Sequence, residues 1–218
     1  ALSSAASDVY KRQVRGEEGR LLYLGYDIDD LVEMCCFEEV VYLLLNKRLP
    51  NRDELEGIKN RLRSDRDLPQ PVLDFFKTAT KSARPMSALR TAVSMLGMYD
   101  DRTKDPGQLK EIGLSLIAKV PVMVAYYYRL CQGLDLPPVR EDLSESEHFL
   151  WLLKGEEPNP DEAHILDVAY ILHADHGMNA STFAARVCIA TLSDMYSAIT
   201  AAIGTLKGPL HGLSLIHI

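Results

Sequence analysis

The chain has 218 residues and a formal net charge of −7, with 47% hydrophobic and 25% charged residues. A chain of this size can bury a sizeable core as one large domain or two small ones. Acidic and basic residues are interspersed, so we expect no basic surface that could neutralise nucleic-acid phosphates. No run of 18 or more uncharged apolar residues occurs, and we expect a cytoplasmic protein that binds neither nucleic acid nor membrane.

Apolar residues recur at three- and four-residue spacings in nearly every segment, which predicts an all-α fold. One helix is expected after Phe37, ending at Asn46, and another begins near Asn51, which can cap it with Glu54 three residues later. The one segment that could be extended runs from Arg20 to Tyr26, as a short strand or as coil. Further helices are expected at about 70–81, 86–99, 108–132, 144–154, 159–175, 180–191 and 194–206.

The cysteines lie within apolar helical patterns and show none of the Cys-x-x-Cys spacing that indicates a zinc or redox site. A free cysteine in such a pattern behaves as a small apolar residue. We therefore interpret all four as buried thiols: Cys35, Cys36, Cys131 and Cys188.

A group of polar side chains beginning at His173 ends a segment rich in Ile and Leu. His173 and His176 would share a helix face and could bind a metal with Asp175, but no third strong ligand stands at a recognised zinc spacing. Alternatively, the histidines hydrogen bond to backbone at the helix end, with Gly177 as C-cap and Asn179 capping the next helix. That alternative does not explain why histidine occupies both positions beside an aspartate.

A second unusual segment, from Gly204 to Gly212, closes another expected helix. Pro209 has the backbone angle of a first helical residue, so His211 would lie in the first turn of a new helix. The unpaired N–H groups there would disfavour imidazolium and leave a neutral histidine able to donate to a carbonyl oxygen that becomes an enolate. Taken alone, a histidine after Gly-Pro is more typical of a surface turn.

Together these segments resemble the citrate synthase family. The likeness rests on His-Ala-Asp-His-Gly-Met-Asn-Ala-Ser-Thr from residue 173, Leu-Ser-Asp-Met-Tyr-Ser from residue 192 and Leu-Lys-Gly-Pro-Leu-His-Gly from residue 206, in that order. Earlier segments agree, including Gly-Tyr-Asp-Ile from residue 25 and Pro-Met-Ser-Ala-Leu-Arg from residue 85. The resemblance covers residues 14–212 and is strongest to the shorter bacterial and archaeal type, which includes 2-methylcitrate synthases.

The resemblance implies a large helical domain used for dimerisation and a small domain that closes over acetyl-CoA and oxaloacetate, without a metal or other cofactor. His211 would be the catalytic residue that donates to the acetyl thioester oxygen during enolisation. His176 would bind oxaloacetate, with His173 and Asn179 beside that pocket. The whole enzyme would be an acyltransferase of the citrate synthase type, a homodimer that forms citrate and CoA at the entry to the tricarboxylic acid cycle. The alternatives are a 2-methylcitrate synthase that uses propionyl-CoA and a non-catalytic helical dimerisation module.

The sequence departs from the family pattern at both ends. We expect residues 1–13 and 213–218 to lie outside the family pattern, to be non-native and to make few contacts. Residues 14–212 would form part of the large domain, and the small domain, the base aspartate, a second catalytic histidine and the oxaloacetate-binding arginines would be absent. Such a fragment would be inactive and would expose a large apolar surface. Leu24 and Arg84 stand where many relatives have arginine and histidine, which obscures the subtype.

Overall fold

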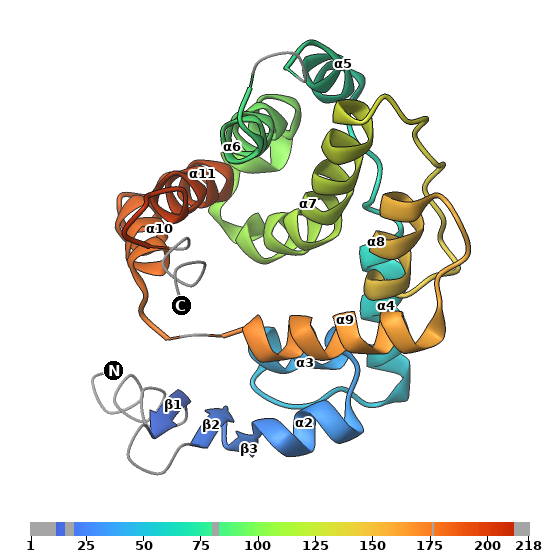
Figure 1. Ribbon diagram of the computed structural model, residues 1–218. Helices are drawn as coiled ribbons and strands as arrows, with labels where there is room; N and C mark the ends of the chain where they lie inside the picture. The colour runs from blue at the N-terminus through green and yellow to red at the C-terminus, as the bar shows by residue number, and fades with distance from the viewer. Residues whose placement is uncertain (1–11, 16–19, 80–82, 176, 212–218) are drawn as a thin grey trace.

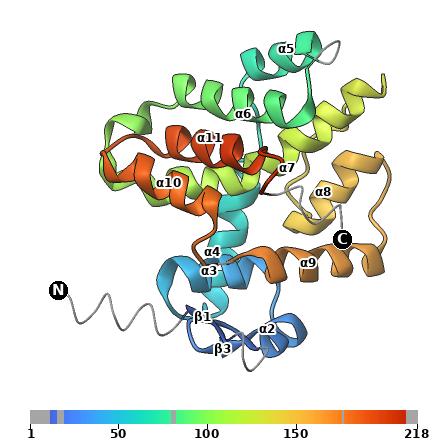
Figure 2. The same ribbon diagram turned by 60° about the vertical axis from the view of Figure 1, so that its left-hand side comes forward.

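The computed structural model describes residues 12–15, 20–79, 83–175 and 177–211, which form a mainly helical molecule (Figures 1 and 2). The strands are β1 (Arg12–Arg15), β2 (Arg20–Tyr23) and β3 (Tyr26–Asp27). The α-helices are α2 (Ile28–Met34), α3 (Phe37–Asn46), α4 (Arg52–Arg63), α5 (Gln70–Ala79), α6 (Pro85–Leu96), α7 (Leu109–Cys131), α8 (Glu145–Lys154), α9 (Pro160–His173), α10 (Ala180–Ala190) and α11 (Met195–Leu206). Short 3₁₀ helices are η1 (Gly97–Tyr99), η2 (Asp101–Lys104) and η3 (Pro106–Gln108). No helix in these described ranges is long and apolar enough to cross a membrane.

The predicted all-α class is confirmed, and the predicted helices lie within a few residues of their expected bounds. Asn51 caps α4 as expected, because its side chain accepts from the backbone N–H of Glu54 at 2.9 Å. The carboxylate of Glu54 accepts in return from the backbone N–H of Asn51 at 2.9 Å. The pair satisfies two N–H groups at the helix start, which is why this local pattern could be recognised in the sequence.

The N-terminal region forms a small antiparallel sheet in the order β1-β2-β3. Strand β2 agrees with the sequence prediction, whereas β1 and β3 show that the expectation of no further sheet is wrong. Arg12 pairs with Tyr23 and Gln13 with Leu22, so these two residues of the 1–13 segment do make contacts. The physical reason is that the backbone groups at the edges of β2 need hydrogen-bond partners, and the segments before and after β2 in the same chain supply them. Residues 1–11 and 213–218 lie outside the described residues.

Helix α7 is the element around which most other helices pack. It contacts α4, α5, α6, α8 and α11. Nearly half of its 23 residues are buried. The buried apolar residues contribute to three clusters, the first shared with α5, α6 and α11, the second with α3 and α4, and the third with α8. Figure 1 shows that α7 bends along its length, and Pro121 lies inside it. Proline removes one N–H from the helical ladder and crowds the preceding turn, so we attribute the bend to Pro121.

Beyond α7, the helices fall into two packing groups. Helices α2, α3 and α8 pack against α9, whereas α10 packs against α11 and α11 against α6. In both views α10 and α11 lie side by side, and the sheet and α2 lie at the far end of the molecule beyond α3 and α9 (Figures 1 and 2). The chain passes from the first group to the second in the turn that follows His173 and ends at Asn179, which we call the α9–α10 turn.

The α10 side of the molecule carries many exposed apolar side chains. Helix α10 buries none of its side chains, and Phe183 and Val187 are 60% and 53% exposed. Met178 before the helix and Leu192 after it are also exposed. Apolar side chains gathered on one element normally lie against other protein. The described residues thus agree with the expected apolar surface.

The cysteines differ from the expectation that all four are buried. Cys131 is exposed, and Cys35, Cys36 and Cys188 are only partly buried. Cys131 is the last residue of α7, where the helix leaves the core, and the apolar pattern alone does not locate that point. Burial raises the pKa of the Cys36 thiol, so that thiol remains protonated and unreactive.

A buried polar junction joins α3, α8 and the connection between α4 and α5. The guanidinium of Arg66, which is fully buried, lies 2.6 Å from Oε1 of Glu145 and donates to the carbonyl of Leu143 at 3.0 Å. Glu38 of α3 accepts from the backbone N–H of Glu145, the first residue of α8, at 3.0 Å. Removing one member of such a pair leaves a buried charge without its partner, so the three segments are held together as a unit.

Asp167 attaches α9 to this junction. Its Oδ2 accepts from the backbone N–H of Phe37 at 3.0 Å, and its Oδ1 accepts from the hydroxyl of Ser146 at 3.3 Å. Burial, and then the nearby charge of Glu38, raise the pKa of Asp167 to about 6. The hydrogen bonds from Phe37 and Ser146 offset only part of that increase. Helix α9 is therefore held to the starts of α3 and α8 by a carboxyl group whose charge is disfavoured.

We predict that Asp167 makes the free energy of unfolding fall as the pH rises from about 4 to about 6. An unfolded aspartate has a pKa of about 3.9, so in this window the folded chain binds more protons than the unfolded chain. Between pH 4 and pH 7 we expect this group to lower the free energy of unfolding by about 1–2 kcal/mol. This is less than the full pKa difference would give, because the carboxyl is partly solvated. Asp167→Asn keeps an oxygen that can accept from the N–H of Phe37 but cannot ionise, so this part of the pH dependence should disappear. Urea unfolding of the variant and the parent at several pH values measures the difference. Identical pH profiles would contradict the assignment.

Candidate active site

Asn179 is the N-cap of α10. Its side-chain oxygen accepts from the backbone N–H of Thr182 at 2.8 Å and lies 2.9 Å from Oγ of Ser181. Its backbone is extended, with φ −74° and ψ 173°, as a residue just before a helix requires. The prediction that Asn179 caps this helix is confirmed.

His211 lies at the same helix start. It follows the end of α11 in a turn formed by residues 207–211, and its backbone N–H donates to the carbonyl of Gly208 at 3.0 Å. Its ring nitrogen Nε2 accepts from the backbone N–H of Ser181 at 3.3 Å and lies 2.8 Å from Oγ of Ser181. Ser181 is the second residue of α10, so its N–H is one of those that a helix leaves unpaired. The structure thus brings His211 and Asn179 together through Ser181.

The expectation that Pro209 begins a new helix around His211 is not met within the described residues. Pro209 and Leu210 are exposed turn residues, and residues from 212 onward are not described. The helix start that His211 contacts is that of α10. The sequence could not indicate this contact, because it depends on the antiparallel packing of α10 and α11, which returns residue 211 to residue 181.

The hydrogen bond from Ser181 decides which ring nitrogen of His211 carries the proton. A backbone N–H can only donate, so in this contact Nε2 is the acceptor, and the tautomer that fits it carries its proton on Nδ1. The hydroxyl of Ser181 has one proton and lies within reach of both Nε2 and the side-chain oxygen of Asn179. Donation to Nε2 is consistent with the backbone N–H bonded to the same atom. In this tautomer Nδ1–H is the donor of the ring.

His173 is held in a different way. It is the last residue of α9, its side chain is exposed, and its Nδ1 lies 2.7 Å from the carbonyl oxygen of Ala169. A carbonyl only accepts, so Nδ1 of His173 carries a proton. This contact agrees with the alternative in which a helix-end histidine bonds to nearby backbone. His176 lies outside the described residues, so its role stays a prediction. Among the residues that the structure describes, no group of three His, Cys, Asp or Glu side chains could hold a metal ion.

The α9–α10 turn is shaped by Asp175 and Gly177. The C-cap of α9 is Ala174, so the expectation that Gly177 is the C-cap is wrong. Gly177 instead has φ +70°, a conformation that glycine adopts without steric cost, and its N–H donates to Oδ1 of Asp175 at 2.9 Å. The backbone N–H of Asp175 donates to the hydroxyl of Tyr23 at 3.2 Å. No sequence motif links Tyr23 to this turn, because the contact joins residues 152 positions apart.

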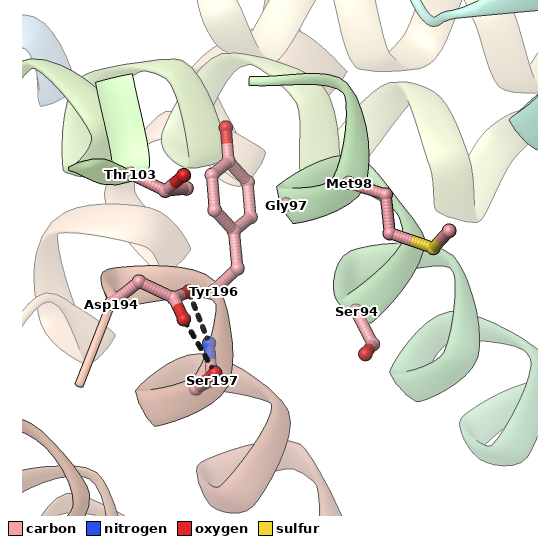
Figure 3. Close-up of a pocket in the computed structure, with 7 residues that line it drawn as sticks. All are labelled: Ser94, Gly97, Met98, Thr103, Asp194, Tyr196 and Ser197. Carbon is pink, nitrogen blue, oxygen red and sulfur yellow. Dashed lines mark hydrogen bonds between the residues drawn. The ribbon is translucent and has the colours of Figure 1, made fainter. Parts of the chain in front are cut away.

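A pocket of about 210 Å³ lies at the opposite end of α11 from His211 (Figure 3). Asp194 caps α11 there by accepting from the backbone N–H of Ser197 at 2.9 Å and from its hydroxyl at 2.7 Å. Tyr196 donates to Asp100 at 2.6 Å. These polar groups fix the start of α11, and none of the predicted site residues lines the pocket. Its lining residues are Ser94, Gly97, Met98, Thr103, Asp194, Tyr196 and Ser197.

We predict that Asn179 stabilises the chain through its cap. Asn179→Ala should lower the free energy of unfolding by about 1 kcal/mol, because the N–H of Thr182 loses its acceptor. Asn179→Asp keeps an oxygen in the same place, and negative charge is favourable at a helix start, so it should cost at most about 0.3 kcal/mol. Urea unfolding of the parent and both variants measures this. Equal losses in the two variants would show that the side-chain oxygen does not act as a cap.

The chain resembles known proteins along most of its length. Residues 1–216 match the family model described as citrate synthase, C-terminal domain. Citrate synthase 2 of Bacillus subtilis (strain 168) is 52% identical over 195 residues, which are 88% of this chain and 52% of that protein. A 2-methylcitrate synthase of Shewanella oneidensis is 42% identical over 193 residues, 88% of this chain and 51% of that protein. The crystal structure of citrate synthase from Pyrobaculum aerophilum has a TM-score of 0.85 at 40% identity, covering 89% of this chain and 51% of that one. The chain spans about half the length of the curated relatives it matches, and it belongs to the citrate synthase family.

Proposed function

We propose that the whole protein condenses acetyl-CoA with oxaloacetate to give citrate and CoA. The observation that carries the proposal is the contact of Nε2 of His211 with the backbone N–H and the hydroxyl of Ser181, which favours the tautomer with its proton on Nδ1. A neutral imidazole can donate to a thioester oxygen that gains negative charge as an enolate forms, and this bond strengthens as the charge develops. Membership of the citrate synthase family supports the same reaction.

In the proposed reaction, a carboxylate base removes a proton from the methyl group of acetyl-CoA while Nδ1–H of His211 donates to the thioester oxygen. The enolate carbon attacks the ketone carbon of oxaloacetate, and water then cleaves the thioester to release citrate and CoA. His173, His176 and Asn179 would contribute to the oxaloacetate pocket. The base, a second histidine and the arginines that hold the oxaloacetate carboxylates would come from the rest of the protein. Neither a metal nor an organic cofactor takes part.

We assign acetyl-CoA as the thioester in preference to propionyl-CoA, because a citrate synthase matches this chain at higher identity than the 2-methylcitrate synthases do. One extra methylene changes the ratio of the kcat/KM values for two substrates by only about 10–200-fold, so a few residues of the acyl pocket decide between acetyl-CoA and propionyl-CoA. The proposal includes a homodimer, and the exposed Phe183 and Val187 on α10 support further burial of this surface.

The test uses the whole protein, obtained by recovering the gene beyond the present chain, and follows thiol release from acetyl-CoA and oxaloacetate. We expect the whole protein to be active and the 218-residue chain to be inactive. His211→Ala should lower kcat by about 10²–10³-fold, because the enolate loses a positioned donor. His164→Ala is the matched control, since this histidine is exposed on α9, and it should keep the parent turnover.

Thiol release by the 218-residue chain, or parent turnover in the His211→Ala enzyme, would overturn the assignment of His211. Faster turnover of propionyl-CoA than of acetyl-CoA would instead establish the 2-methylcitrate alternative. A whole protein that forms dimers but releases no thiol with either substrate would favour the non-catalytic module.

A further inference from the structure

The structure assigns Tyr23 a positioning role: its hydroxyl fixes the α9–α10 turn that lies between the proposed oxaloacetate contacts His173 and Asn179. This inference rests on the proposed function. Tyr23 belongs to β2 of the N-terminal sheet, and its side chain is 1% exposed. Nothing in the proposed chemistry uses it directly, so it is not a catalytic residue.

The hydroxyl of Tyr23 closes the C-terminus of α9. It donates to the carbonyl of Ile171 at 2.9 Å, and the carbonyl of Leu172 lies at 3.2 Å. It also accepts from the backbone N–H of Asp175 at 3.2 Å. The last carbonyls of a helix have no partner within the helix, and a buried carbonyl or N–H without a partner is costly. One hydroxyl therefore satisfies groups on both sides of the point where the helix ends.

The restraint continues from Asp175 into the turn. Oδ1 of Asp175 accepts from the N–H of Gly177 at 2.9 Å, and Gly177 has φ +70°. Asn179, two residues later, is fixed as the N-cap of α10. Among the described residues of the turn, Asp175 is thus held by Tyr23, Gly177 by Asp175, and Asn179 by its role as the cap. Loss of the Tyr23 hydroxyl releases the first of these restraints.

The ring of Tyr23 has a separate, structural role. It packs in the cluster formed with Leu31, Val40, Leu43 and Ile171, which joins the sheet, α2, α3 and α9. Burial raises the pKa of Tyr23, so the hydroxyl keeps its proton and remains a donor. Phenylalanine would keep the packing and remove only the hydroxyl, leaving the N–H of Asp175 without this partner. A single substitution therefore separates positioning from packing.

Hydrogen exchange of the whole protein tests whether Tyr23 holds the turn. In Tyr23→Phe, we expect the peptide that spans residues 172–178 to exchange about tenfold faster, while the centre of α7 around Met123 exchanges as in the parent. Tyr26→Phe is the matched control, because Tyr26 lies on the adjoining strand β3 with its side chain 39% exposed, and it should change neither region. Unchanged exchange at 172–178 would overturn the inference. Equal acceleration in α7 would also overturn it, since it would show a general loss of stability.

The kinetics of the whole protein test whether this positioning serves oxaloacetate. In Tyr23→Phe, we expect the KM for oxaloacetate to rise about 5–10-fold with kcat within about twofold of the parent, because the loosened turn is in its binding form less of the time while His211 stays in place. If Tyr23 served only stability, the variant would contain less folded enzyme, so apparent kcat would fall while the KM for oxaloacetate stayed unchanged. Faster exchange with unchanged KM would overturn the link to oxaloacetate. If the parent protein releases no thiol with oxaloacetate, the proposed function fails, and the exchange result alone decides whether Tyr23 holds the turn.

Discussion

The antiparallel contact between α10 and α11 is the constraint on which the candidate site depends. It returns the end of α11 to the start of α10, so that the ring of His211 meets the backbone N–H of Ser181. Helix α11 is itself held against α6, and α6 against α7, whose bend at Pro121 lets one helix contribute to three hydrophobic clusters. The position of one imidazole therefore follows from the packing of four helices, because no local sequence feature would hold it there.

Two helix ends flank the α9–α10 turn, and each end is completed by side chains from elsewhere. The C-terminus of α9 is closed by Tyr23 from the N-terminal sheet, and the N-terminus of α10 is completed by Asn179 and by His211 from the end of α11. Unpaired backbone groups at helix ends need partners, and here the partners that satisfy them are also the residues that define the site. Structure and proposed chemistry thus meet at the start of α10, where Asn179 caps the helix and Ser181 contacts the ring of His211.

The sequence was most informative where the determining interactions are local. Apolar spacing located the helices, and the capping of α4 by Asn51 and of α10 by Asn179 follows from side chains two or three residues from the groups they satisfy. The motif around His211 indicated the residue but not its contact with Ser181, which spans 30 positions. Strand β1, the exposure of Cys131 and the bond between Tyr23 and Asp175 likewise depend on which distant segments meet. A single sequence does not carry that information.

The contact with Ser181 predicts that Nε2 of His211 is unprotonated and that Nδ1 carries the donor proton. Two-dimensional ¹⁵N NMR of the chain labelled at histidine, recorded near pH 8, where a histidine with the usual pKa of about 6.5 is neutral, reports directly which ring nitrogen bears the proton. The structure predicts a protonated Nδ1 and an unprotonated Nε2 at His211. A protonated Nε2 in that ring would contradict the proposed role of Nδ1–H as the donor.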